Sequence, residues 1–370
     1  MLGGRDGYLL PRPLQALERW PRSRIVVVAV LLSIALGVVD WLTGPQFSFT
    51  IFYLVPVALV AWLIDLRGAV WISLFCAGVW TAADWESFSS TVPAVVDLWN
   101  AVVRLAFFLL VTWALATTRR ALQSQNALAR RVQLGLLPPS LPVDGAIESA
   151  ASWRPAQAVS GDFYFLTEDA EGRVVACIAD VSGKGVGPAL LMANVQAALE
   201  ASVEAGAAPG ALCTRLNHFL SRRANEGRYV TFFAMRLDPV SGTLAYCNAG
   251  HNPPLILRAD GSVERLDAGG PVLGVFPDRS FEEAERPLKP RDRVILYTDG
   301  VSESWNAAGE EFGEARIVAA ARGAKWAGAE ETQRRILMAL DGFARGDYHD
   351  DVTTVVLSVR PNGSHEMRST

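Results

Sequence analysis

Acidic residues at the ends of strand-like runs are the positions in this sequence best suited to chemistry. They are Asp162 after a glycine, Asp180 at the end of VVACIAD, Asp299 in VILYTDG, and Asp350 and Asp351 before VTTVVLSV. A single acid in such a place is usually a turn former, but the recurrence favours a carboxylate cluster. Carboxylates without His or Cys suit Mg²⁺ or Mn²⁺, and two such ions can activate water for in-line attack on phosphorus. The acids therefore predict a two-metal site.

Other chemistry-bearing residue types are scarce. The chain has four cysteines and four histidines, and neither set has the spacing of a zinc site or a redox motif. The formal net charge of −4 gives no electrostatic case for nucleic-acid binding.

The elements that hold the acids alternate strand-like runs with paired helical runs from about residue 146 onward. This pattern favours a layered α+β sandwich over a doubly wound parallel sheet. The expected strands are 147–153, 162–167, 174–181, 229–237, 243–248, 255–258, 294–298 and 352–359. The expected helices are 187–205, 209–224, 314–321 and 330–344.

An ordered set of segments covers nearly all of 128–359. The segments are LARRVQLGLLPPSLP, AVSGDFYFL, CIADVSGKGVGPALLMANVQ, YVTFFAMRLDPVSGTLAYCNAGHNPPLIL, GGPVLGVFPD, DRVILYTDGVSESWNAAGEEFGEARI and DDVTTVVLSV. Together they resemble the SpoIIE-type branch of the metal-dependent, type 2C-like serine/threonine protein phosphatases. The resemblance implies an αββα sandwich over 138–360 with a flexible tail at 361–370. It also implies hydrolysis of phosphoserine or phosphothreonine on a partner protein, in this family usually an anti-sigma-factor antagonist.

The same resemblance assigns roles residue by residue. It implies that Asp180 binds and bridges two divalent cations, Mn²⁺ or Mg²⁺, and that the backbone carbonyl of Val181 adds a ligand. Asp162 would bind a cation directly or through water, and Asp299 and Asp350 would complete the second site. The metal-activated water would be the nucleophile. Asp180 and Asp162, which hold the cations, would be the catalytic residues. Asp350 is chosen because the family's ligand is the first acid of its D-[DN]-x-[TS] motif.

Two further residues of the matched segments keep two interpretations each. Lys184 of SGKG either contacts the substrate phosphate or is a solvated loop charge. His251 of NAGHNPP either donates a proton to the leaving serine oxygen or is a structural turn histidine. Two positions depart from the family, since Phe165 replaces a frequent second Asp and Ser160 replaces a glycine. Neither removes an expected ligand, so activity is expected.

Residues 1–116 have the composition of a membrane region. Sparse charges divide it into apolar runs of about 20 residues, the length that crosses a bilayer. The expected transmembrane helices are 25–42, 47–64, 68–84 and 95–116.

The basic residues of this region predict its orientation. Arginines precede the first helix, separate the second from the third and follow the fourth, whereas the other connections lack Lys and Arg. Both termini and the catalytic domain are therefore expected on the cytoplasmic side of a multi-pass inner or plasma membrane protein. A cleaved signal peptide competes for the first run, but no small-residue cleavage site follows it.

Four charged residues of this region are candidates for sensing. Asp40, Asp84 and Asp97 lie near the outer ends beside tryptophans, and Arg104 lies within the fourth apolar run. An intramembrane arginine is a functional candidate. The group either lines an outward-facing sensor pocket or serves as interfacial anchors with a structural Arg–Asp pair.

The segment 117–137 reads as a linker helix. Leu115, Leu122, Ala129 and Leu136 have heptad spacing, which permits a homodimer through a short coiled coil. A plain connecting helix is an equal alternative.

Two other classes of function compete with a phosphatase. A catalytically inactive, phosphatase-like receptor or scaffold would keep the fold, but all four acid positions are retained. A nucleotide cyclase or histidine kinase shares the membrane-plus-linker layout. The sequence contains neither a Gly-rich ATP lid nor a phosphoacceptor histidine on the linker.

Overall fold

The structure is a computed structural model that describes most of the chain. The described residues are 17, 20–43, 49–84, 94–138, 145–222, 227–323, 327–346 and 348–361. The chain divides into two compact units, Met1–Leu128 and Ala129–Thr370. Each unit has its own buried apolar core.

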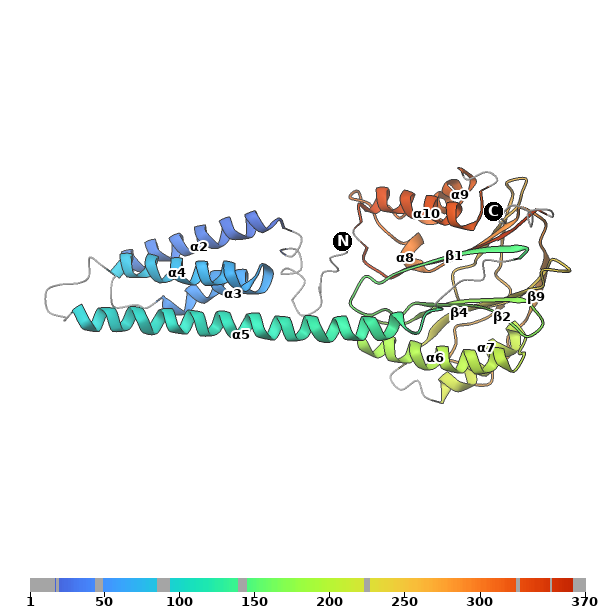
Figure 1. Ribbon diagram of the computed structural model, residues 1–370, viewed down its shortest axis with the longest axis horizontal. Coiled ribbons are helices and arrows are strands. Elements are labelled where there is room, and N and C mark those ends of the chain that lie inside the picture. The colour runs from blue at the N-terminus through green and yellow to red at the C-terminus, as the bar shows by residue number, and fades with distance from the viewer. Residues whose placement is uncertain are drawn as a thin grey trace, which may run out of the picture. The chain divides into compact units, whose positions relative to one another are not determined.

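The first unit is built from apolar helices (Figure 1). These are α2 (Arg22–Thr43), the 3₁₀ helix η1 (Thr50–Tyr53), α3 (Leu54–Leu63), α4 (Leu66–Asp84) and α5 (Ala94–Leu134). Within the described residues α2, α4 and α5 are long and apolar enough to cross a membrane. The expected linker helix forms the C-terminal part of α5, which is continuous to Leu134.

The second expected span, 47–64, is shorter in the structure. Its described helical part is Thr50–Leu63, below the length of the other apolar helices. Pro56 lies in the first turn of α3, where its missing N–H leaves no helical hydrogen bond unmade. The α-helical part of this stretch therefore begins just before the proline, directly after η1.

The second unit contains two facing β-sheets. One has the strand order β1–β11–β10–β6–β7, and the other has the order β2–β3–β4–β5–β8 with β9 beside β5. The first sheet consists of β1 (Ile147–Arg154), β6 (Leu255–Leu257), β7 (Val263–Arg265), β10 (Arg293–Tyr297) and β11 (Val352–Val359). The second consists of β2 (Phe163–Glu168), β3 (Val174–Val181), β4 (Val230–Leu237), β5 (Thr243–Ala249), β8 (Gly269–Gly270) and β9 (Ala284–Pro287).

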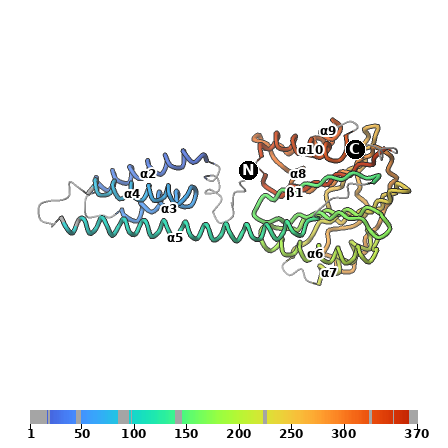
Figure 2. Tube along the Cα trace, in the orientation of Figure 1, coloured from blue at the N-terminus to red at the C-terminus, as the bar shows by residue number. Residues whose placement is uncertain are grey.

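Helices cover both outer faces of the sheet pair, as Figure 2 shows. On one side lie α6 (Val186–Glu204) and α7 (Pro209–Ser221), and on the other α9 (Gly313–Gly323) and α10 (Ala329–Ala344). Apolar residues of α6 and α7 join one core cluster with the second sheet, and those of α9 and α10 join another with the first. The layered α+β sandwich expected from the sequence is confirmed in the order αββα.

Helix α6 also has the length and hydropathy of a membrane span. Its buried residues include Met192, Val195, Leu199 and Val203, which recur every three or four positions along one face. They belong to the core cluster shared with β3. Its apolar character is therefore explained by packing within the sandwich.

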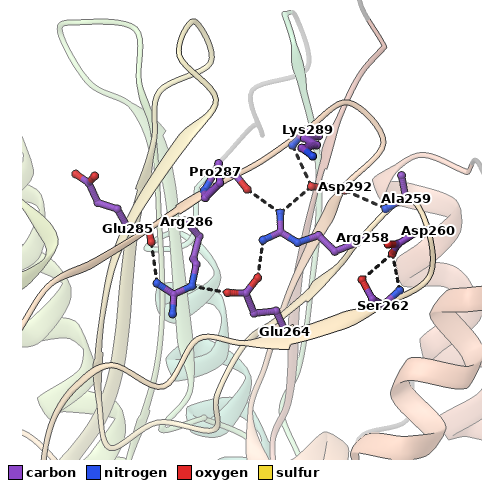
Figure 3. Close-up of polar contacts among 10 residues, drawn as sticks. All are labelled: Arg258, Ala259, Asp260, Ser262, Glu264, Glu285, Arg286, Pro287, Lys289 and Asp292. Carbon is purple, nitrogen blue, oxygen red and sulfur yellow. Dashed lines mark hydrogen bonds and ion pairs between the residues drawn. The ribbon is translucent and has the colours of Figure 1, made fainter.

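The sequence analysis missed the short strands β7, β8 and β9 and the four-residue helix α8 (Asp299–Ser302). Strands β7 and β9 carry charged residues in place of an apolar alternation, so periodicity gave no signal. A polar network holds them (Figure 3): Glu264 accepts hydrogen bonds from Arg258, at 2.5 Å, and from Arg286. Arg258 also donates to Asp292 at 2.9 Å. Since β7 and β9 lie in different sheets, the ion pair between Glu264 and Arg286 links the two layers.

Candidate metal centre

Strand pairing brings the predicted acids to one edge of the sandwich. Asp162 immediately precedes β2, which pairs antiparallel with β3, so it lies beside Asp180 near the end of β3. In the other sheet β10 pairs antiparallel with β11. Asp299 after β10 therefore lies close to Asp350 before β11. The antiparallel order explains why acids far apart in sequence meet.

Asp162 joins the two sheets at this edge. Only 1% of the residue is exposed, and its Oδ2 accepts hydrogen bonds from Thr298 Oγ1 and Thr353 Oγ1, both at 2.7 Å. These threonines come from the ends of β10 and β11. The indole Nε1 of Trp153 donates to the Asp162 carbonyl oxygen at 2.9 Å. The sequence analysis missed all three partners, although Thr298 is the last residue of one predicted strand and Thr353 the second residue of another.

The carboxyl groups raise one another's pKa. Burial raises the pKa of Asp180 to about 7, and the charges of Asp299, Asp350 and Asp351 add to the shift. Burial, followed by the charge of Asp350, raises the pKa of Asp299 to about 6. Burial and the charge of Asp180 also raise the pKa of Asp162 well above its ordinary value. The carboxyl groups are thus close enough to repel one another in a poorly solvated place.

The side chains interact but do not converge on one point. Within the described parts of the chain, no group of three His, Cys, Asp or Glu side chains is placed to hold a metal ion. Instead, Lys184 Nζ pairs with Asp350 Oδ2 at 2.8 Å and donates to the His349 carbonyl oxygen at 2.7 Å. The predicted loop lysine therefore lies at this edge, bonded to one of the predicted ligands.

Asp351 has a different environment from its neighbour Asp350. Its carboxylate accepts hydrogen bonds from Ala156 N at 2.7 Å, Ser160 Oγ at 2.6 Å and Gly161 N at 3.1 Å. These three hydrogen bonds tie the Asp351 carboxylate to the loop before β2. Asp350 instead pairs with Lys184, and its choice as the metal ligand stays a prediction.

Gly161 leaves room for the backbone at the predicted metal edge. A Cβ on this residue would lie 2.8 Å from the Val181 carbonyl oxygen and 3.5 Å from Asp180 Oδ1. The Val181 carbonyl oxygen and the Asp180 carboxylate are both predicted metal ligands. A glycine is needed here because any side chain would press on the carbonyl that the prediction assigns to the metal.

Gln133, at the end of α5, is a contact that the sequence analysis missed. Its side-chain Nε2 donates to the Ser160 carbonyl oxygen at 2.7 Å, and Ser160 N donates back to Oε1 at 3.0 Å. Gln133 is only 4% exposed. In the sequence, the one sign of this contact was that Gln133 is a polar residue between the apolar residues Val132 and Leu134 of the matched segment.

His251 lies inside the sandwich, 5% exposed. Its Nδ1 lies 2.8 Å from Thr231 Oγ1 and its Nε2 lies 3.2 Å from the Tyr297 carbonyl oxygen. Burial lowers the pKa of the imidazole to about 4. Both ring nitrogens thus have protein partners. The role of His251 as a proton donor to the leaving serine oxygen stays a prediction.

The sensor candidates belong to the first unit. Asp40 is buried, and the Arg104 guanidinium lies 3.0 Å from the centre of the Trp80 ring. The side chains of Asp84 and Asp97 lie outside the described residues. The sensing role stays a prediction.

Known proteins support the assignment of the second unit. The family model for stage II sporulation protein E (SpoIIE) matches residues 170–360. The phosphoserine phosphatase RsbU of Bacillus subtilis is 30% identical over 186 residues, which cover 50% of this chain and 55% of that protein. The chain thus spans little more than half the length of this curated relative.

Solved structures share the fold. The RsbU and RsbW domains of Rv1364c from Mycobacterium tuberculosis match with 27% identity and a TM-score of 0.54, covering 61% of this chain and 63% of that one. The SiaA-PP2C domain of Pseudomonas aeruginosa matches with 22% identity and a TM-score of 0.58, covering 66% and 99%. With the family match over 170–360 and an αββα sandwich carrying the strand-end acids, the chain belongs to the SpoIIE family of PP2C-type phosphatases.

Proposed function

We propose that the chain is a membrane-anchored, metal-dependent phosphatase that hydrolyses phosphoserine or phosphothreonine on a partner protein. The observation that carries the proposal is the set of buried and half-buried, mutually repelling carboxyl groups at one edge of the sandwich. Lys184 is close to Asp350 and Asp299, but one ammonium balances only part of the carboxylate charge. Divalent cations are the groups that relieve such repulsion most directly. Fold and electrostatics therefore point to the same edge.

The donor set fits hard divalent cations. Asp162, Asp180, Asp299, Asp350 and the Val181 carbonyl would hold Mn²⁺ or Mg²⁺, since all donate through oxygen. When bound, these cations supply an activated water and neutralise charge on the phosphoryl group. The protein itself orients Asp162 through the Thr298 and Thr353 hydroxyls and keeps the edge poorly solvated.

Lys184 would contact the substrate phosphate. Its side chain is 42% exposed and pairs with Asp350, so its ammonium lies between the predicted ligands and the solvent. A cation bound by Asp350 would compete with Lys184 and free its ammonium for a phosphoryl oxygen. Lys184 would then hold the incoming phosphate.

The partner would be a phosphorylated protein, and an anti-sigma-factor antagonist is the candidate that the family resemblance implies. The name of RsbU, phosphoserine phosphatase, supports phosphoserine as the target group. The two-domain RsbU and RsbW structure supports a signalling setting. The route from membrane to phosphatase would run through α5, alone or as a homodimer.

The first unit would anchor the chain in the membrane with both termini in the cytoplasm. Helices α2, α4 and α5 support this by length and composition. Alkaline carbonate extraction should leave the chain in the membrane pellet, and a C-terminal tag should be protease-sensitive only when the cytoplasmic face is accessible. Release by carbonate would contradict membrane anchoring.

The test of the activity uses the full chain in detergent. Hydrolysis of p-nitrophenyl phosphate, and then of a phosphoserine protein, should require Mn²⁺, stop with EDTA, and be lost in Asp180→Asn and Asp299→Asn. The matched control is Asp260→Asn, which changes an exposed turn aspartate and should leave turnover unchanged. Turnover that persists in EDTA or in both variants would show the metal assignment to be wrong. A folded wild-type chain without turnover would favour the inactive receptor or scaffold.

A further inference from the structure

His251 forms a bridge between the two sheets directly behind the predicted metal ligands. Its Nδ1 lies 2.8 Å from the hydroxyl of Thr231 in β4. On the other side its Nε2 lies 3.2 Å from the carbonyl oxygen of Tyr297 in β10. These strands belong to different sheets, so one imidazole spans the layer between them.

The partners define the direction of both hydrogen bonds. The Tyr297 carbonyl can only accept, so Nε2 of His251 carries the hydrogen. Nδ1 then has a lone pair, which accepts the hydroxyl hydrogen of Thr231. Burial lowers the pKa of His251 to about 4, so the ring is neutral at neutral pH and one tautomer satisfies both partners.

Each end of the bridge adjoins a predicted ligand. Thr231 pairs with Asp180 in the register of β3 and β4, and its hydroxyl oxygen lies 3.5 Å from the Asp180 carbonyl oxygen. Tyr297 precedes Asp299 by two residues. The ring therefore connects the segment that carries one acid to the segment that carries the other.

The turn Asn248–His251 fixes the direction in which the His251 imidazole projects. His251 N donates to Asn248 Oδ1 at 2.7 Å, and Asn248 Nδ2 donates to the His251 carbonyl oxygen at 3.0 Å. Gly250 has φ +67°, and a Cβ there would lie 2.8 Å from Val272 N. Only glycine fits this tight turn without strain. The residues of the NAGH motif thus fix the backbone from which the imidazole projects.

We propose that His251 is a positioning residue that sets the spacing of Asp180 and Asp299, and through it the affinity of the site for divalent cations. The proposal rests on the proposed phosphatase function. A bridge between the sheets limits how far the two carboxylates can move apart, so less of their repulsion is relieved by separation before a cation binds. Without the bridge, the contacts of Asp162 with Thr298 and Thr353 would be left to hold the strand ends together against the carboxylate repulsion.

The test is calorimetric titration of the full chain in detergent with Mn²⁺. The central variant is Thr231→Val, because valine keeps the shape of threonine and removes only the hydroxyl that His251 accepts. Losing one buried hydrogen bond predicts an Mn²⁺ affinity lower by about tenfold. Thr231→Ser keeps the hydroxyl and should bind Mn²⁺ like the wild type. His251→Ala should lose at least as much affinity as Thr231→Val.

Activity provides the second measurement. In Thr231→Val the Mn²⁺ concentration for half-maximal turnover should rise by about tenfold, while KM for p-nitrophenyl phosphate at saturating Mn²⁺ should stay unchanged. A residue that only stabilises the fold would lower the unfolding temperature without moving the Mn²⁺ titration. That result in Thr231→Val, or equal losses in Thr231→Val and Thr231→Ser, would overturn the positioning role. A wild-type chain that neither binds Mn²⁺ nor turns over substrate would overturn the proposed function and the inference together.

Discussion

Replacing Asp180 by Asn is expected to stabilise the metal-free protein while removing its response to Mn²⁺. Burial, together with the charges of Asp299 and Asp350, raises the pKa of the Asp180 carboxyl from 3.8 to about 7. A carboxyl whose folded pKa is raised contributes stability below its unfolded pKa, and this stability is lost as the pH rises through the folded pKa. At pH 8 the metal-free wild type therefore carries an unfavourable buried charge that an amide lacks.

The magnitude follows from that shift. Moving the pKa of Asp180 from 3.8 to about 7 corresponds to about 4 kcal/mol of stability lost by pH 8. The amide weakens the hydrogen bond that Asp180 shares with Asp162, which offsets about 1 kcal/mol. A net gain of about 3 kcal/mol slows amide exchange through unfolding by roughly a hundredfold.

Hydrogen exchange followed by mass spectrometry on peptides covering β3 measures this effect within the full chain. In EDTA at pH 8, Asp180→Asn should exchange about a hundredfold more slowly than wild type, and the difference should shrink at pH 5. Adding Mn²⁺ should protect the wild type and leave the variant unchanged. Faster exchange in Asp180→Asn at pH 8, or equal protection of both proteins by Mn²⁺, would refute the electrostatic reasoning.

Four other substitutions test neighbouring contacts. Gly161→Ala should lower Mn²⁺-dependent turnover at least tenfold, since its Cβ would lie 2.8 Å from the Val181 carbonyl oxygen; an Mn²⁺ titration of activity measures this. Asp350→Asn should abolish turnover without loss of thermal stability. Asp351→Ala should instead reduce unfolding free energy by about 2 kcal/mol, because three donors lose their acceptor; denaturant unfolding separates the two. Gln133→Leu should reduce turnover while the chain keeps its helix content by circular dichroism. Full activity would show that the pairing of Gln133 with the loop is dispensable.

The sequence predicted the parts of this fold whose signal is local. Apolar runs that end in an acid and a turn located β3 and β10, and an apolar run that follows two acids located β11, all within one residue of their observed ends. Helix α10 was predicted at 330–344 against Ala329–Ala344, since its apolar residues recur at helical spacing. The short strands β7 and β9 gave no such signal because their charges are matched only across space, as in the pairing of Glu264 with Arg286.

The candidate site divides in the same way. Residue types and strand ends identified Asp180 and Asp299, but not the hydroxyls of Thr298 and Thr353 that hold Asp162. A threonine next to a strand is unremarkable in a sequence, because its role depends on which strand lies opposite. Sequence reasoning therefore finds the groups that would bind a metal more readily than the groups that hold them in place.

Those holding groups matter because the acids repel one another. Left to relax, the carboxylates of Asp180 and Asp299 would separate or take up protons, as their raised pKa values indicate. Hydrogen bonds from neutral groups hold the carboxylates in place without supplying a positive charge. The negative charge of the carboxylates therefore still favours binding of a cation. A lysine in place of Thr298 would satisfy Asp162 and weaken that preference. In the proposed site, the neutral contacts of Thr298 and Thr353 with Asp162 would thus leave the carboxyl charge there to be balanced by a divalent cation.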